Sequence, residues 1–270
     1  MSLASYTFAA LFVAALALSV RADETAKADE TAKAKDTRVF EMRTYYAAEG
    51  KLDALNARFR DHTLKLFAKH GMTNLGYWMP IENKDNRLIY VLAYDSNEAR
   101  EKAWKDFVAD PDWKKAKADS EVNGPLVSKS ESVFLEAADY SPEIKPAATG
   151  DRVFELRVYT ATQGNLDKLH TRFREHTTKL FAKHGMTNVA YFRTAAKTPS
   201  GKDQPQAENL LVYFLAHKSE AAGKASFTEF RKDPDWIAAK GASEKDGSLT
   251  TMPEGVKSTY LNATDYSPMK

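Results

Sequence analysis

Two stretches of this 270-residue chain are copies of one another, and that internal repeat limits the possible folds before any other feature is considered. Arg38-Val-Phe-Glu-Met-Arg43 returns as Arg152-Val-Phe-Glu-Leu-Arg157, and residues 62–74 return as residues 176–188 with one substitution. Asp-Pro-Asp-Trp occurs at 110–113 and 233–236, and Asp-Tyr-Ser-Pro occurs at 139–142 and 265–268. Because the motifs keep their order, each copy should form the same folded unit. We therefore predict two domains, 38–142 and 152–268, joined by a linker over 143–151.

Each copy reads as β-α-β-β-α-β. In the first copy, the hydrophobic patterns predict strands at 38–45, 73–79, 88–94 and 132–137. One helix is predicted over 51–70, with Gly71 as its stop, and a second from Ser96, with a restart at Asp110-Pro111. The second copy has a longer polar connection at 194–208, which predicts an exposed loop.

This order of elements is that of the ferredoxin-like fold, in which helices cover one face of a four-stranded antiparallel sheet. The other face of each sheet must also be buried. Two copies in one chain therefore predict an α+β protein, with two tandem ferredoxin-like repeats packing sheet to sheet as an intramolecular pseudo-dimeric α+β barrel. We expect a monomer with pseudo-twofold symmetry or a homodimer.

The segment before the first domain has the features of a targeting sequence. Residues 8–20 form an apolar run, shorter than the roughly 20 residues that a membrane-spanning helix needs. With Val20-Arg21-Ala22 as a cleavage site, they predict a signal peptide over 1–22 and export to the periplasm or the cell exterior. We expect no stable membrane insertion after cleavage; the alternative is an uncleaved anchor. Residues 23–37 lack aromatic and β-branched aliphatic side chains, which predicts a disordered linker.

Composition excludes several classes of protein. There are no cysteines, which excludes disulfides, thiolate nucleophiles, iron–sulfur clusters and cysteine-ligated zinc. Lys and Arg number 39 against 37 Asp and Glu, a formal net charge of +2, so no electrostatic feature favours a nucleic acid as partner. The sequence also lacks glycine-rich nucleotide loops, Gly-x-Ser-x-Gly and His-Glu-x-x-His. We expect no nucleic acid and no bound cofactor.

Three motifs of the first copy resemble those of the NIPSNAP family, within the dimeric α+β-barrel superfamily. They are Phe-Glu-Met-Arg-Thr-Tyr at 40–45, the helix end from His62 to Gly71, and Asp-Pro-Asp-Trp at 110–113. The resemblance covers both repeats, and it implies a ferredoxin-like fold that pairs sheet to sheet. Family members are mostly small proteins of undetermined activity, some of them mitochondrial. Mitochondrial roles are not carried over, because we predict a secretory signal for this chain.

Polar side chains alternate along the first strand of each copy. Glu41, Arg43 and Tyr45 share one face, opposite Phe40 and Met42, which we expect to pack on helices. The second copy repeats the set as Glu155, Arg157 and Tyr159. We predict that both sets project between the two sheets. One interpretation is a buried salt bridge that fixes sheet pairing, and the other is an arginine anchor for a ligand carboxylate or enolate, with the glutamate as base or orienting partner.

The histidines do not predict a metal site. His62 and His70 are about 12 Å apart along one helix, too far to share an ion, and we expect no bound metal. We expect His70 to pack in the core or to interact with the last-turn carbonyls at the helix end. His62 and its counterpart His176 are the better candidates for facing a cavity. His170 and His217 have no histidine counterpart in the other copy, and we expect them on the surface.

Aromatic residues from the second and third strands of each copy complete the candidate ligand residues. They are Tyr77, Tyr90, Tyr191 and Tyr213, for which a position in the core is the favoured interpretation. Three functions stay open. The first is an exported module that binds a small, partly apolar or anionic ligand between its sheets. The second is a cofactor-independent oxygenase or isomerase, and the third is a non-catalytic structural or interaction protein.

Overall fold

The computed structural model of the chain describes residues 36–147, 150–204 and 209–270. The predicted signal peptide, nearly all of the predicted linker at 23–37 and part of the loop at 194–208 lie outside the described residues. Within the described residues, no helix has both the length and the apolar character required to cross a membrane.

Both repeats fold in the predicted order of elements, with the predicted helix restart at Asp110-Pro111, except that the predicted continuous helix at 51–70 is divided into shorter segments, as is its counterpart in the second repeat. The first repeat consists of β1 (Val39–Ala47), α1 (Leu52–Arg58), η1 (Phe59–Thr63), α2 (Leu64–Lys69), β2 (Thr73–Pro80), β3 (Arg87–Tyr94), α3 (Asn97–Ala109), α4 (Pro111–Ser120) and β4 (Val127–Ala137). The second consists of β5 (Val153–Thr160), α5 (Leu166–Arg172), η2 (Phe173–Thr177), α6 (Thr178–Lys183), β6 (Thr187–Thr194), β7 (Leu210–His217), α7 (Glu220–Lys232), α8 (Pro234–Ser243) and β8 (Val256–Ala263).

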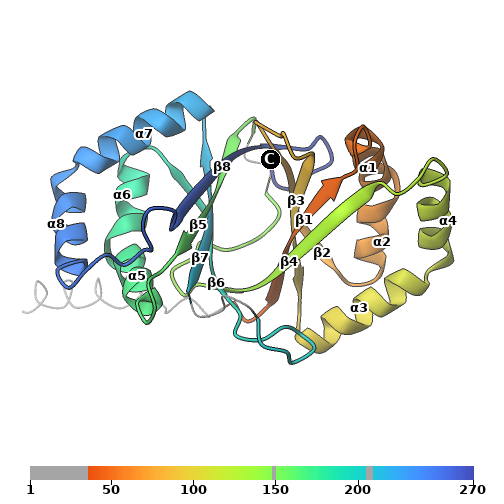
Figure 1. Cartoon of the computed structure of the whole chain (residues 1–270), viewed down its shortest axis with the longest axis horizontal. Helices are drawn as coiled ribbons and strands as arrows, with labels where there is room; N and C mark the ends of the chain where they lie inside the picture. Colours follow the sequence, from red (N-terminus) through yellow and green to blue (C-terminus); the bar gives the residue numbers. More distant parts are fainter. Residues whose placement is uncertain (1–35, 148–149, 205–208) are drawn as a thin grey trace, which may run out of the picture. The chain divides into compact units, whose positions relative to one another are not determined.

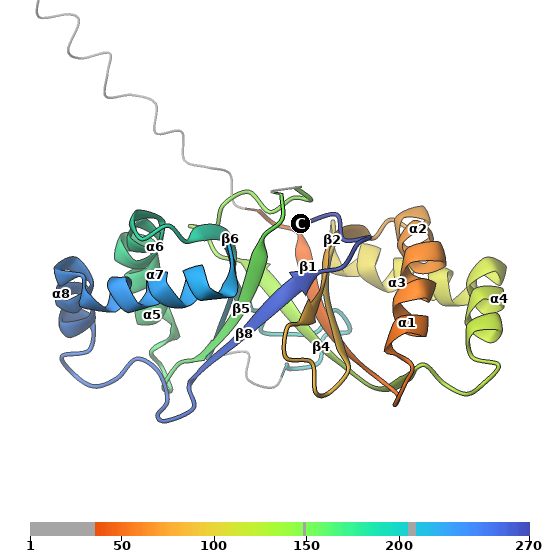
Figure 2. The same ribbon diagram turned by 90° about the horizontal axis from the view of Figure 1, so that it is seen from above.

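The eight strands form one closed antiparallel barrel in the order β1-β3-β2-β8-β5-β7-β6-β4 (Figures 1 and 2). Each repeat contributes four neighbouring strands. The repeats join where β2 pairs with β8, from Trp78 to Pro80, and where β4 pairs with β6, from Leu135 to Ala137. The predicted fold class, an intramolecular α+β barrel built from two ferredoxin-like repeats, is confirmed.

The barrel interior is filled by apolar side chains from both sheets, among them Phe40 and Met42. The Trp78 ring lies 5.5 Å from the ring of Phe154 and 5.0 Å from that of Phe214, both in the second repeat. A pocket of about 10 Å³ is found in this layer, which is room for one water molecule at most. This pocket is too small for the ligand that we expect between the sheets.

The prediction for the two faces of β1 is wrong. Phe40 and Met42 lie in the interior, whereas Glu41, Arg43 and Tyr45 lie on the outer face, beneath the helices. The interior cluster of the described residues is apolar, while the helix layer supplies charged side chains such as the guanidinium of α3 that binds Glu41. The second repeat places its corresponding set on the same side: Glu155, Arg157 and Tyr159.

The Lys-His-Gly and Asp-Pro-Asp-Trp motifs contact each other. Asp110 caps α4 by accepting a hydrogen bond from the Asp112 amide at 2.8 Å, as predicted. Its other oxygen lies 2.8 Å from Lys69 Nζ and 2.7 Å from His70 Nε2. These bonds hold the pKa of Asp110 well below its usual range. His70 therefore ties the end of α2 to the start of α4, and the second repeat makes the same contacts through Asp233.

Each copy of the Asp-Tyr-Ser-Pro motif packs on the opposite repeat, which gives a structural reason for its presence in both copies. Asp265 forms a two-point ion pair with Arg60, at 2.6 and 2.8 Å. The Tyr266 hydroxyl donates to Asn56 Oδ1 at 2.6 Å, and the Tyr77 amide donates to a serine of the motif at 2.9 Å. The motif at 139–142 makes the reciprocal contacts with the second repeat. This exchange locks the two repeats together.

Candidate functional site

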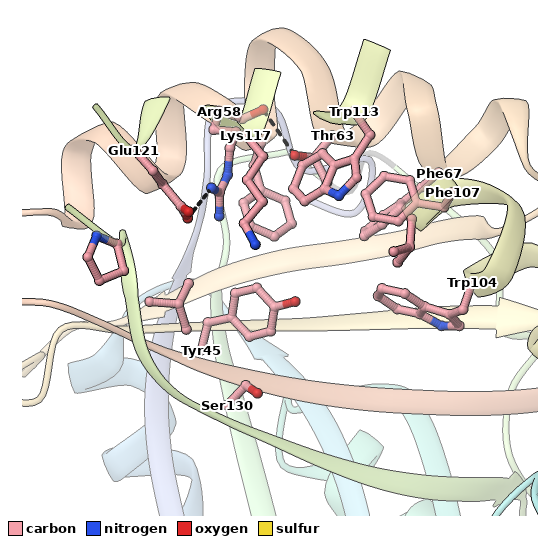
Figure 3. Close-up of a pocket in the computed structure, with 14 residues that line it drawn as sticks. Tyr45, Arg58, Thr63, Phe67, Trp104, Phe107, Trp113, Lys117, Glu121 and Ser130 are labelled. Carbon is pink, nitrogen blue, oxygen red and sulfur yellow. Dashed lines mark hydrogen bonds and ion pairs between the residues drawn. The ribbon is translucent and has the colours of Figure 1, made fainter. Parts of the chain in front are cut away.

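A pocket of about 350 Å³ lies in the first repeat, between its helices and the outer face of its sheet (Figure 3). We call it the first-repeat pocket. Its size suits a small organic molecule. Strands β1 and β4 and all the helical segments of this repeat contribute to its lining: Tyr45, Arg58, Phe59, Thr63, Phe67, Trp104, Phe107, Val108, Trp113, Lys117, Glu121, Pro125, Val127 and Ser130.

Aromatic rings form much of the pocket wall. The ring of Phe107 lies 4.8 Å from that of Phe67 and 4.4 Å from that of Trp113. Trp104 meets Phe67 edge to face at 5.4 Å, and Tyr45 meets Phe59 in the same way at 5.9 Å. Rings from four helical segments and one strand therefore surround the pocket, which offers a large apolar surface to a flat ligand.

A π-helical turn shapes the upper side of the pocket. The predicted continuous helix at 51–70 is interrupted by η1, where the Leu64 amide bonds to the Phe59 carbonyl. The Arg58 carbonyl accepts instead from the Thr63 hydroxyl at 3.1 Å, and all three of Arg58, Phe59 and Thr63 line the pocket. Such turns often occur at functional sites. The second repeat has the same turn at η2.

Two cationic side chains and one carboxylate reach the pocket. Arg58 Nη1 lies 2.7 Å from Glu121 Oε1, and Arg58 Nε has no hydrogen-bond partner among the described residues. The Lys117 side chain extends from α4 toward Tyr45 (Figure 3). In the part of the chain that the structure describes, its amine makes no ion pair. Because Arg58 neutralises Glu121, the charge of Lys117 is left for a ligand.

Glu41 anchors a buried ion network beside the pocket. Its side chain is fully buried, and it bonds to Arg43 Nη1 at 2.5 Å and to Arg100 Nε and Nη2 at 3.1 and 3.0 Å. The Tyr94 hydroxyl donates to it at 3.1 Å. Burial alone would raise the pKa of Glu41, but the two guanidiniums outweigh it and lower the pKa. Glu41 therefore stays ionised and orients Arg43, a structural role that the sequence left as one of two interpretations.

The second repeat builds the corresponding network from different residues. Glu155 bonds to Arg157 at 2.6 Å, to His217 Nε2 at 2.9 Å and to the Ser258 hydroxyl at 2.5 Å. The prediction that His217 lies on the surface is wrong, because it is 1% exposed. Gly223 occupies the position of Arg100, since a Cβ there would come within 3.0 Å of the His217 ring. His217 stands where the first repeat has Tyr94, so sequence comparison of the copies missed the exchange of a tyrosine and an arginine for a histidine and a glycine.

His170 is also buried, against expectation. It is 5% exposed, and its Nδ1 lies 2.9 Å from the Tyr140 hydroxyl. Burial, with a smaller contribution from the nearby Arg193 and Arg174, lowers the pKa of His170 to about 4, because the nearby carboxylates oppose this only in part. The residue belongs to the contact between the repeats and lies outside the first-repeat pocket.

The structure brings only some of the predicted site residues to the pocket. Tyr45 lines it, and Tyr90 lies directly behind Tyr45 at a ring distance of 5.3 Å. Tyr77 and Tyr90 stack on each other beneath the helices, as Tyr191 and Tyr213 do in the second repeat. They are buried core residues whose hydroxyls face the helix side.

The prediction that His62 faces a cavity is wrong, because the residue is exposed on η1 and absent from the pocket lining. His176 is half exposed and lines an open groove of about 560 Å³ between η2, α6 and α8. The groove is walled by alanines and exposed charged side chains such as Lys179 and Asp235. It lacks the enclosed aromatic wall of the first-repeat pocket. Among the described residues, no three His, Asp or Glu side chains are grouped as metal ligands.

Arg58, Lys117 and Glu121 are the pocket residues that the sequence analysis missed. One signal was available, because all three recur at equivalent places in the second copy as Arg172, Lys240 and Glu244. Arg172 also pairs with Glu244 at 2.7 Å. The recurrence of these charged residues in both copies therefore indicated a shared role. Only the structure shows that they line one pocket.

Comparison with known proteins agrees with this fold. The family model described as NIPSNAP matches residues 40–142 and 154–268. No match was found among curated proteins.

Three solved structures illustrate the similarity. An anthrone oxidase-like protein is 12% identical, covering 87% of this chain and 95% of its own, with a TM-score of 0.55. A candidate monooxygenase from Lactobacillus acidophilus is 11% identical, covering 84% and 94%, with a TM-score of 0.50. A NIPSNAP domain protein from Burkholderia xenovorans is 27% identical, covering 39% of this chain and 99% of its own, with a TM-score of 0.35. The first two similarities concern the fold, at identities too low to transfer chemistry.

Proposed function

This chain belongs to the NIPSNAP family, with two copies of the family domain, and on that premise we propose that it binds a small aromatic acid in its first-repeat pocket. The observation that carries the proposal is the combination of an aromatic wall with one lysine amine that has no ion-pair partner among the described residues. A monomer is sufficient, because all the lining residues come from one repeat.

The apolar wall supplies affinity for a flat hydrophobic body. Burying apolar surface contributes about 25 cal/mol per Å², and ring-on-ring contacts add further stabilisation. Trp104 and Trp113 belong to different helices, and both present rings to the pocket. A bicyclic aromatic ligand would contact both and still fit within about 350 Å³.

The charge distribution favours an acid over a neutral or basic ligand. Glu121 is the carboxylate of the lining, and Arg58 already pairs with it at 2.7 Å. Lys117 carries a further positive charge at the helix side of the pocket. A ligand carboxylate beside Lys117 would gain a charge-assisted hydrogen bond, whereas a ligand amine would be repelled.

Replacing Lys117 with methionine is expected to weaken the binding of 2-naphthoate about five- to tenfold, because the charge partner of the carboxylate is lost. Isothermal titration calorimetry measures this change. The matched control is Lys240→Met, since Lys240 occupies the equivalent position in the second repeat and lies 3.8 Å from Glu244. The control should bind 2-naphthoate as tightly as the unmodified protein.

Two results would contradict the proposal. The first is no heat of binding with 2-naphthoate at millimolar concentration, which would favour a structural or interaction role for the whole chain. The second is an equal loss of affinity in Lys117→Met and Lys240→Met, which would show that the ligand does not distinguish the first-repeat pocket.

An oxygenase acting on such a ligand is the second candidate function. The observation in its favour is the shared fold with an anthrone oxidase-like protein and a candidate monooxygenase, together with a pocket whose rings suit a polycyclic substrate. Oxygen consumption with anthrone decides between the two functions. An enzyme accelerates it above the rate in buffer, and a binding protein leaves that rate unchanged.

We also propose export, for which the support is the sequence of residues 1–22. A mature N-terminus at Asp23, found by mass spectrometry of protein from outside the cytoplasm, would support the proposal. Intact protein found in the cytoplasm would contradict it.

A further inference from the structure

We infer that the ligand of the first-repeat pocket carries a second oxygen at the end opposite its acidic group, and that Arg43 and Tyr90 bind this oxygen. The oxygen would belong to a phenol, a quinone or a ketone. The inference rests on the proposed function and specifies its ligand class. It also separates the two repeats, because the equivalent groups of the second repeat are bonded to each other.

Two buried polar groups behind the pocket wall lack partners. Within the described residues, neither Arg43 Nε nor the Tyr90 hydroxyl has a well-formed hydrogen bond of 3.5 Å or less, and the polar group beside Tyr90 that also raises its pKa is the Tyr45 side chain. Tyr90 is fully buried, and its burial raises the pKa of the phenol well above the usual value, so the group is a hydroxyl at neutral pH. Both groups can donate a hydrogen bond. Unsatisfied buried donors cost free energy, and one acceptor oxygen placed between them would satisfy both.

Both groups are in contact with the pocket lining. The Arg43 guanidinium lies 4.5 Å from the ring centre of Trp104 and 5.4 Å from that of Tyr45, two residues of the lining. The Tyr90 ring lies 5.3 Å from the rings of Tyr45 and Phe59, which also line the pocket. Rotation of the Tyr45 side chain would therefore connect the pocket with both donors. Arg43 holds the Tyr45 hydroxyl only loosely, at 3.5 Å.

The second repeat shows the closed form of the same constellation. Arg157 Nε donates to the Tyr213 hydroxyl at 2.9 Å, and Arg157 Nη2 donates to the Tyr159 hydroxyl at 3.1 Å. These residues correspond to Arg43, Tyr90 and Tyr45 in the aligned strands. The second-repeat counterparts of the two unpartnered groups, Arg157 Nε and the Tyr213 hydroxyl, thus bond to each other. Neither is left to bind a ligand oxygen in the second repeat.

The residues around the two arginines differ between the repeats. Arg43 stacks on Trp104 and shares the Glu41 carboxylate with Arg100. In the second repeat, Arg157 stacks on Phe227, and Gly223 stands at the place of Arg100. The first repeat therefore combines a larger ring with an additional guanidinium beside its arginine.

The two recognition points come from opposite layers and fix the orientation of the ligand. Lys117 descends from α4, while Arg43 and Tyr90 belong to strands β1 and β3. The acid group would lie at the helix layer and the second oxygen at the sheet, with the aromatic body between them (Figure 3). A site with buried donors discriminates strongly against an analogue that lacks the matching acceptor.

The test compares 6-hydroxy-2-naphthoate with 2-naphthoate by isothermal titration calorimetry. The unmodified protein should bind the hydroxylated probe about tenfold more tightly. Tyr90→Phe removes one hydroxyl and should abolish this preference. Tyr213→Phe is the matched control and should keep the preference.

Thermal unfolding of the same two variants provides a readout that needs no ligand. Tyr213→Phe breaks the 2.9 Å bond to Arg157 and should lower the Tm by about 2–4 °C. Tyr90→Phe breaks no such bond and should leave the Tm within about 1 °C of the unmodified protein.

The outcomes separate this inference from the proposed function. Equal destabilisation by the two Tyr→Phe changes would overturn it, because both constellations would then be closed. A tenfold preference that survives Tyr90→Phe, with binding still weakened by Lys117→Met, would also overturn it and leave the proposed function standing. Absence of any naphthoate binding would remove the proposed function and this inference with it.

Discussion

The substitution Glu41→Gln is expected to lower the free energy of unfolding by about 3–5 kcal/mol, the range for removing one partner of a buried ion pair. Glu41 is fully buried, and Arg43 and Arg100 are 14% and 15% exposed. The neutral amide would leave Arg43 without its counter-charge, and Arg100 with only the half-exposed Glu101, which lies 3.0 Å from its Nη1. Arginine remains protonated in proteins, so neither group can escape the penalty by losing its proton.

Urea denaturation measures this loss, and Glu155→Gln provides the matched comparison. Glu155 pairs with one arginine and with His217, and an imidazole can remain as a neutral group where a guanidinium cannot. The loss in Glu155→Gln should therefore be smaller than in Glu41→Gln. A loss below about 1 kcal/mol in Glu41→Gln, or a larger loss in the second repeat, would show that the network does not carry the stability assigned to it.

The second large effect is a loss of stability in mild acid that depends on His170. Burial lowers its folded pKa to about 4 from an ordinary 6.5. As the pH falls from 6.5 to 4, the unfolded chain takes up a proton that the folded protein excludes, so stability decreases across this window. A shift of this size corresponds to about 3 kcal/mol, and below pH 4 this contribution no longer changes.

The substitution His170→Asn isolates this effect, because the first repeat has Asn56 at the equivalent position. Asn56 accepts a hydrogen bond from Tyr266 at 2.6 Å, so His170→Asn can keep the corresponding contact with Tyr140. The groups around His170 are Tyr140, Arg193, Asp167, Arg174 and Asp139. Urea denaturation at a series of pH values should show a shallower decline for the variant between pH 6.5 and 4. Parallel declines would exclude His170 as the cause.

Much of the fold could be predicted because the repeat gives the same information twice. Each strand and cap motif occurs in both copies, and local rules place them: Ser96 and Asp110 cap helices as expected, with bonds of 3.1 and 2.8 Å. Closure into one barrel follows from the requirement that the second face of each sheet be buried. These conclusions depend on contacts between neighbouring residues and on the need to bury apolar surface, and both are visible in sequence patterns.

The orientation of β1 could not be predicted from its own residues. Alternation shows that Phe40 and Glu41 face opposite ways, but both faces of this sheet are buried. Which face is interior depends on partners from other elements: Arg100 of α3 bonds to Glu41, and His217 of β7 bonds to Glu155. Residues far along the chain thus decide the side on which each glutamate is acceptable.

The candidate site was missed for a related reason. Lys117, Arg58 and Tyr45 come from three separate elements and meet only in the folded repeat. The unsatisfied Tyr90 hydroxyl is likewise invisible in a sequence where Tyr90 and Tyr213 occupy equivalent positions. Identical residues in the two copies suggested identical roles, whereas their surroundings make one constellation open and the other closed.

A crystal structure of the protein with 6-hydroxy-2-naphthoate would test the location of the ligand site most directly. We predict that the probe occupies the first-repeat pocket, with its carboxylate at Lys117 and its hydroxyl at Arg43 and Tyr90. A probe bound inside the barrel against Trp78, or bound equally in both repeats, would contradict the account.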